Sequence, residues 1–180
     1  MLTVVTVFIA LLYPLAIWLG QGRIEPRFLA ALLLLAALTG LHALKVRHAW
    51  RWWLGGTLLM AIPAAWNNAW LPLKLYPAFV NAAMLGLFAY SLISPPSMAE
   101  RFARLREANF PVEAIGYTRQ VTQVWCVFFA VNGAIALTTA LWASAAVWSL
   151  YNGLIAYLLM GLLFAGEYFV RGHFKRRHHV

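Results

Sequence analysis

Six long apolar runs alternate with shorter polar segments along the chain. They cover residues 2–20, 28–44, 50–66, 71–93, 121–142 and 147–170. A hydrocarbon core about 30 Å thick needs about 20 mostly apolar helical residues to cross it. Leu and Ala are abundant in the runs and strict alternation is absent, so helices are favoured over strands. We expect an all-α fold, a polytopic transmembrane helical bundle of about six spans that forms one domain, residues 1–180.

The third run is the weakest of the six. It contains Arg51, Pro63 and two glycines, and only a short turn at Asn67 and Asn68 separates it from the fourth run. A re-entrant hairpin in place of spans three and four is therefore the alternative to two full crossings.

Residues 95–120 form the only long polar segment. Within it, Ser97 and Glu100 have the spacing of a capping box, in which the two side chains bind backbone amides at the start of a helix. Met98, Phe102 and Leu105 then recur at helical spacing. The pattern predicts a short amphipathic helix on the cytoplasmic surface between spans four and five. The segment's arginines are candidate contacts for protein partners or lipid headgroups: Arg101, Arg104, Arg106 and Arg119.

The formal net charge of +9 is gathered at the ends of the apolar runs. With both termini in the cytoplasm, only three of the 14 lysines and arginines lie on the opposite side, namely Arg23, Arg27 and Lys74. This bias predicts a multi-pass inner-membrane protein with cytoplasmic termini and a basic cytoplasmic tail, residues 171–180. The cations also suit membrane lipids as partners. No nucleic-acid motif accompanies the charge, so we expect no nucleic-acid partner.

Polar side chains within the runs form a candidate intramembrane polar cluster of Glu167, Arg171, Asn81, Asn132 and Asn152. Glu167 and Arg171 are four residues apart, the spacing of a helical salt bridge. A proton-carrying or catalytic carboxylate, and a contact to a partner or headgroup, are the alternatives for Glu167. For the asparagines, hydrogen bonds between helices are favoured over substrate binding.

Small residues repeat at four-residue spacing in the last three runs, a pattern that allows helices to approach closely. We therefore expect spans four to six to form the packed core through these faces. They are Ala78, Ala82 and Gly86, then Ala130 and Ala134, then Gly161 and Ala165.

Recognisable catalytic chemistry is missing from the sequence. Cys126 is the only cysteine, the five histidines lack metal-site spacing, and the chain contains no aspartate. No glycine-rich phosphate loop or nucleophile elbow is present. We expect no catalytic residue, cofactor or metal, and a non-enzymatic role is favoured.

Several motifs resemble those of a family of small bacterial inner-membrane proteins encoded among aryl-polyene and fatty-acid-like biosynthesis enzymes. They are SPPSMAERFARLR (94–106), YTR (117–119), VWCVFFAVNG (124–133), YNGLIAYLLMGLLFAGEY (151–168) and GRIEPRF (22–28). The second half of the chain is more distantly similar to the intracellular septation protein A family. The resemblances imply a membrane component of polyene or acyl-lipid synthesis, or of envelope synthesis and septation, and neither implies a catalytic residue.

Together these features favour a non-enzymatic membrane protein that scaffolds envelope or lipid biosynthesis through membrane or cytoplasmic biosynthetic partners. A small transporter or lipid flippase acting as a homo-oligomer is the first alternative. A membrane-embedded enzyme is the second.

Overall fold

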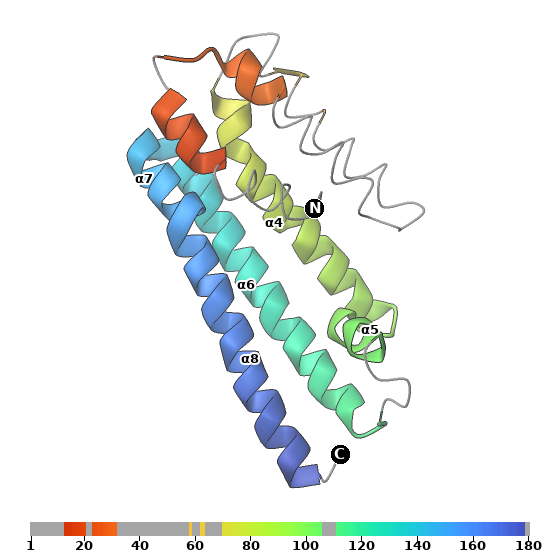
Figure 1. Cartoon of the computed structure of the whole chain (residues 1–180). Helices are drawn as coiled ribbons and strands as arrows, with labels where there is room; N and C mark the ends of the chain where they lie inside the picture. The colour runs from red at the N-terminus through yellow and green to blue at the C-terminus, as the bar shows by residue number, and fades with distance from the viewer. Residues whose placement is uncertain are drawn as a thin grey trace. The chain divides into compact units, whose positions relative to one another are not determined.

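The computed structural model describes residues 13–20, 23–31, 58, 62–63, 70–105 and 111–178, with side chains as far as residue 172. All regular secondary structure in these ranges is helical, which confirms the all-α class. The helices are α4 (Leu71–Ile93), α5 (Met98–Arg104), α6 (Ala114–Trp142), α7 (Ala145–Leu150), the π-helical turn η1 (Tyr151–Ile155) and α8 (Ala156–His178) (Figure 1). Residues 13–20 and 26–31 are helical as well.

Three helical segments are long and apolar enough to cross a membrane: Leu71–Ile93, Ala114–Trp142 and Ala145–Gly172. They correspond to the last three predicted spans. The first of them has the predicted bounds, and α6 begins at Ala114 rather than at residue 121. Most of residues 2–66 lies outside the described part of the chain. The re-entrant hairpin considered for spans three and four therefore also stays a prediction. A total of six spans therefore stays a prediction.

The chain divides into two compact units. The first comprises Met1–Phe79 and Ile135–Ala156, and the second comprises Val80–Ala134 and Tyr157–Val180. The expectation of one membrane domain stays a prediction.

A proline inside α4 organises the described core of the first unit. Pro77 has no N–H, so the carbonyl of Leu73, four residues earlier, loses its helical donor. The buried Tyr13 hydroxyl donates to that carbonyl at 3.0 Å. The Trp148 indole N–H donates to the next carbonyl, that of Lys74, at 3.1 Å. Two buried aromatic residues thus satisfy backbone groups at the proline break, as an apolar environment requires.

The π-helical turn η1 lies in the same unit. Asn152 is buried, and its side-chain amide donates to the Trp148 carbonyl at 2.9 Å and to Thr139 Oγ1 at 3.3 Å. A Cβ on Gly153 would lie only 3.2 Å from Cβ of Pro14. Glycine therefore permits a close approach of η1 to helical residues 13–20.

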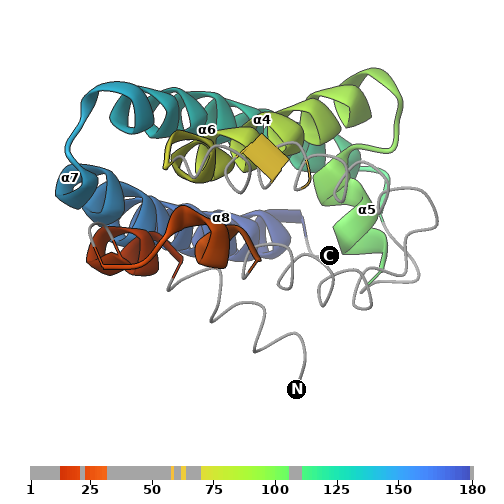
Figure 2. The same ribbon diagram turned by 90° about the horizontal axis from the view of Figure 1, so that it is seen from above.

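Aromatic side chains form the core of the second unit. Phe88 of α4 packs edge-on against Phe129 of α6, with 5.1 Å between ring centroids. Trp125 of α6 lies 4.6 Å from Phe164 of α8, again between centroids. Within this unit α6 and α8 run side by side (Figure 2). Helix pairing here relies on large interlocking rings.

The predicted small-residue faces are not the packing faces in the described structure. Exposed positions among them are Ala82, Gly86, Ala130, Ala134, Gly161 and Ala165. A Cβ added to Gly86 or Gly161 would have no atom within 4 Å. That prediction was wrong because the aromatic residues occupy the helix contacts and turn the small residues outward.

Candidate functional site

Helix α5 is tied to both of the long helices between which it lies in the chain. At its start, the Met98 N–H donates to Oγ of Ser91 on α4 at 2.9 Å. The next amide, that of Ala99, donates to Oγ1 of Thr122 on α6 at 3.1 Å. Thr122 is fully buried, and its own hydroxyl donates to the Thr118 carbonyl at 2.9 Å. Two hydroxyls from neighbouring helices therefore satisfy the first amides of α5.

The predicted capping box correctly marks where α5 begins, but its hydrogen bonds are different. Ser97 is the residue before the helix and has extended backbone angles, yet its side chain makes no capping bond. Its hydroxyl is buried and has no partner within the described residues. Glu100 turns toward Arg104 instead of the helix start. The predicted bonds of the box were wrong: Ser91 and Thr122 bind the amides of Met98 and Ala99 instead, and Glu100 pairs with Arg104.

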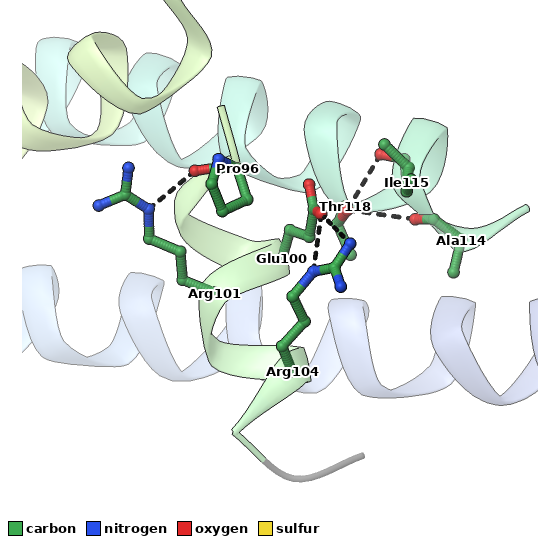
Figure 3. Close-up of polar contacts among 7 residues, drawn as sticks. All are labelled: Pro96, Glu100, Arg101, Arg104, Ala114, Ile115 and Thr118. Carbon is green, nitrogen blue, oxygen red and sulfur yellow. Dashed lines mark hydrogen bonds and ion pairs between the residues drawn. The ribbon is translucent and has the colours of Figure 1, made fainter. Parts of the chain in front are cut away.

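Arg101 caps the end of α4. Its Nε donates to the Pro96 carbonyl at 2.8 Å (Figure 3). Its Nη2 donates to the Ser94 carbonyl at 3.3 Å. These carbonyls follow the last residue of α4, where helical donors run out. A cation at this end also complements the negative end of the helix dipole. Arg101 therefore has a structural contact and keeps an exposed guanidinium.

Arg104 forms an ion pair with Glu100 on the same helix. Its Nε and Nη2 lie 2.9 Å and 2.7 Å from Glu100 Oε1 (Figure 3). The Glu100 side chain is only 7% exposed, whereas that of Arg104 is 48% exposed. Arg104 thus compensates a buried acid, and its charge is largely offset within α5.

The other two predicted arginines differ from this pair. Arg119 lies on α6, is exposed, and makes no hydrogen bond or ion pair within the described part of the chain. Arg106 lies outside the described residues. Among the candidate arginines that the structure describes, Arg119 is therefore the one whose side chain is not held by an internal hydrogen bond or ion pair.

The exposed residues of α5 and its C-cap include large apolar side chains beside the two arginines. Phe102 is 57% exposed and Leu105, its C-cap residue, is 82% exposed. The buried side carries Ala103 and the acid Glu100. A helix packed on a water-soluble protein normally turns its large apolar residues inward, so the exposure of Phe102 and Leu105 is unusual for such a helix.

The candidate intramembrane polar residues form separate contacts. Asn132 Nδ2 on α6 donates to Asn81 Oδ1 on α4 at 3.0 Å, and both side chains are buried. A Cβ on Gly133 would lie 3.0 Å from Cβ of Asn81, so the glycine allows the two helices to meet. Asn152 makes its contacts in the first unit, with Thr139 and Trp148. The asparagines therefore connect helices.

Glu167 lies on α8 beside the start of α6. The Tyr117 hydroxyl donates to the main-chain carbonyl of Glu167 at 3.4 Å, a long hydrogen bond. Glu167 and Arg171 are both partly buried. A salt bridge between them, and a catalytic role for Glu167, stay predictions.

Ser91, Thr118 and Thr122 are the residues that sequence reasoning missed. The two threonines recur four residues apart around the start of predicted span five, so they share one helix face. That spacing was a signal for a polar contact surface.

The fold defines a helical protein with three helices able to cross a membrane. The chain matches no protein-family model, no curated protein and no solved structure.

Proposed function

We propose that this protein is a non-enzymatic, multi-pass inner-membrane protein that scaffolds envelope or lipid biosynthesis by holding protein partners at its cytoplasmic face. Both termini lie in the cytoplasm in this proposal, as the distribution of Lys and Arg favours. The resemblance to proteins encoded with aryl-polyene biosynthesis enzymes, and more distantly to septation protein A, suggests the pathway. The observation that carries the proposal is the attachment of α5 to the ends of two candidate spans.

The exposed apolar residues of α5, which lie beside two exposed arginines, support a position at the membrane surface. Phe102 and Leu105 face outward while Glu100 faces inward. Burying a side chain of this size is worth about 1.5–3 kcal/mol relative to leaving it in water. The arrangement is therefore favourable when the outward face meets the acyl boundary of a bilayer, as in interfacial helices.

The length of α6 supports a headgroup-level position for Arg119. Its 29 residues span about 43 Å at about 1.5 Å per residue, which exceeds the hydrocarbon thickness of about 30 Å. The polar residues at its start belong to the excess length. Arg119 then lies beyond the hydrocarbon, where a cation can bind an acidic partner.

Site-specific photo-crosslinking in cells tests the proposal. A photoreactive residue replaces Gln120, next to Arg119, or Leu158, which is 59% exposed in the last candidate span. We expect position 120 to crosslink a defined biosynthetic enzyme and position 158 to give no such product. Arg119→Ala should reduce the crosslink at position 120 several-fold and impair the envelope phenotype of the strain.

The matched control replaces Glu100 and Arg104 together by Gln, which removes an internal ion pair without leaving an unpaired acid. The crosslink should survive this change. Crosslinks at position 120 that contain no protein, together with a normal envelope in Arg119→Ala cells, would contradict scaffolding.

A small transporter or flippase is the second candidate, favoured by the Pro77 break in α4 and by the π-helical turn η1. Interrupted helices form substrate sites in many transporters. The carbonyls of Leu73 and Lys74 are, however, already bound by Tyr13 and Trp148. Substrate movement in proteoliposomes that Asn152→Leu abolishes without unfolding would favour transport over scaffolding.

A further inference from the structure

We propose that Arg101 binds the phosphate of an anionic phospholipid from the surrounding leaflet. This inference rests on the proposed membrane-surface position of α5. It assigns a ligand to one of the loop arginines and separates that arginine from its neighbour Arg104.

The neighbouring partners of the two guanidinium groups differ in charge. Arg104 is paired with the Glu100 carboxylate, so its field is offset at short range. Arg101 is held by two neutral carbonyl groups and has no ion pair within the described residues. Figure 3 shows the two side chains turned in different directions, Arg101 toward Pro96 and Arg104 toward Glu100. Arg101 therefore retains its positive charge for an external anion.

The hydrogen bonds of Arg101 also prepare it for a phosphate. A guanidinium has five N–H donors in a rigid plane, and two of its nitrogens bind the carbonyls of Pro96 and Ser94. These contacts fix the plane, and within the described part of the chain they leave other N–H groups unused. A fixed guanidinium suits a phosphate, which accepts two parallel hydrogen bonds, and it loses little side-chain entropy on binding.

Apolar residues beside Arg101 indicate that the phosphate belongs to a lipid. Ile93, which precedes the Arg101-bound Ser94, is 81% exposed. Phe102, which follows Arg101 on α5, is 57% exposed. A cation beside exposed apolar side chains, at the end of a candidate span, complements a ligand with an anionic headgroup and acyl chains.

Lipid titration of the detergent-purified full chain tests this assignment. Native mass spectrometry measures the apparent dissociation constants for phosphatidylglycerol and for zwitterionic phosphatidylcholine. We expect Arg101→Gln to weaken phosphatidylglycerol binding about fivefold, the contribution of one interfacial cation, and to leave phosphatidylcholine binding unchanged. The paired change Glu100→Gln with Arg104→Gln should leave both constants unchanged. Inorganic phosphate should not displace phosphatidylglycerol, because it lacks acyl chains.

Arg101→Gln also removes the cap on α4, so amide exchange of residues 98–104 is measured in parallel. If Arg101→Gln loosens α5, the lipid titration is repeated with Arg101→Lys. Lysine keeps the positive charge, so this variant should keep the preference for phosphatidylglycerol over phosphatidylcholine. A folded lysine variant without the preference overturns the assignment. So does an equal loss in the Glu100/Arg104 pair, or displacement by free phosphate. Partner crosslinking at position 120 is independent of these outcomes, so scaffolding and lipid binding can fail separately.

Discussion

Thr122→Val should loosen α5 while leaving the rest of α6 in place. Valine is nearly isosteric with threonine but cannot accept the hydrogen bond from the Ala99 amide, which is 3.1 Å from Thr122 Oγ1. Loss of a hydroxyl that caps a helix start costs about 1 kcal/mol. Amides of residues 98–104 should therefore exchange with deuterium about fivefold faster, as measured by mass spectrometry in detergent or nanodiscs.

Thr118→Val is the matched control. Thr118 is also buried and lies one turn earlier on α6, but its hydroxyl bonds only carbonyls of its own helix, those of Ala114 and Ile115 (Figure 3). It should leave exchange in α5 unchanged, and Thr122→Ser should restore protection because serine keeps the hydroxyl. If Thr118→Val accelerates exchange in α5 as much as Thr122→Val does, α5 is not held by Thr122 and the reasoning fails.

Three further changes test the helix contacts. Asn132→Leu removes the buried hydrogen bond to Asn81 Oδ1 and should lower the free energy of unfolding by about 1–3 kcal/mol, whereas the double change to leucine should recover part of the loss; chemical denaturation in mixed micelles measures both. Gly133→Ala should lower the melting temperature, because its Cβ would meet Cβ of Asn81 at 3.0 Å, while Gly161→Ala, with no atom within 4 Å, should not. Tyr13→Phe leaves the Leu73 carbonyl without its donor, and should destabilise the first unit by about 1 kcal/mol, visible as faster amide exchange near Pro77; unchanged exchange there would contradict the proposed role of Tyr13.

The apolar pattern predicted the long helices well but not the start of α6. Residues 71–93 are mostly apolar and lie between the Asn67–Asn68 turn and the polar segment that follows Ile93, so hydropathy places both ends of α4 closely. At α6 the helix begins at Ala114, before the apolar run at Val121, because backbone hydrogen bonding continues through polar residues. Hydropathy identifies the residues that can lie in the hydrocarbon core. The full length of a helix also includes polar turns that extend beyond those residues.

The sequence predicted that asparagines connect helices, but it did not identify the particular partners of polar groups on other helices. The sequence shows the Ser97 and Glu100 pattern, and it shows that asparagines occur in apolar runs. It does not show that Ser91 and Thr122 reach the α5 amides, or that Asn132 meets Asn81. Those contacts depend on how far one helix is shifted along another, which large side chains such as Phe88 and Trp125 set through packing.

The same reasoning separates the structural residues of the polar segment from those proposed to act on other molecules. In an apolar medium an unsatisfied backbone group is costly, and hydroxyls and aromatic N–H or O–H groups meet that need at the start of α5 and at the Pro77 break. Arg104 likewise provides the ion pair that the buried Glu100 carboxylate requires. Arg119 has no such internal task in the described chain, and Arg101 is held by neutral groups that leave its charge uncompensated. Changing all loop arginines at once would therefore mix loss of α5 structure with loss of binding, and only single changes at Arg119 and Arg101 distinguish a protein partner from a lipid.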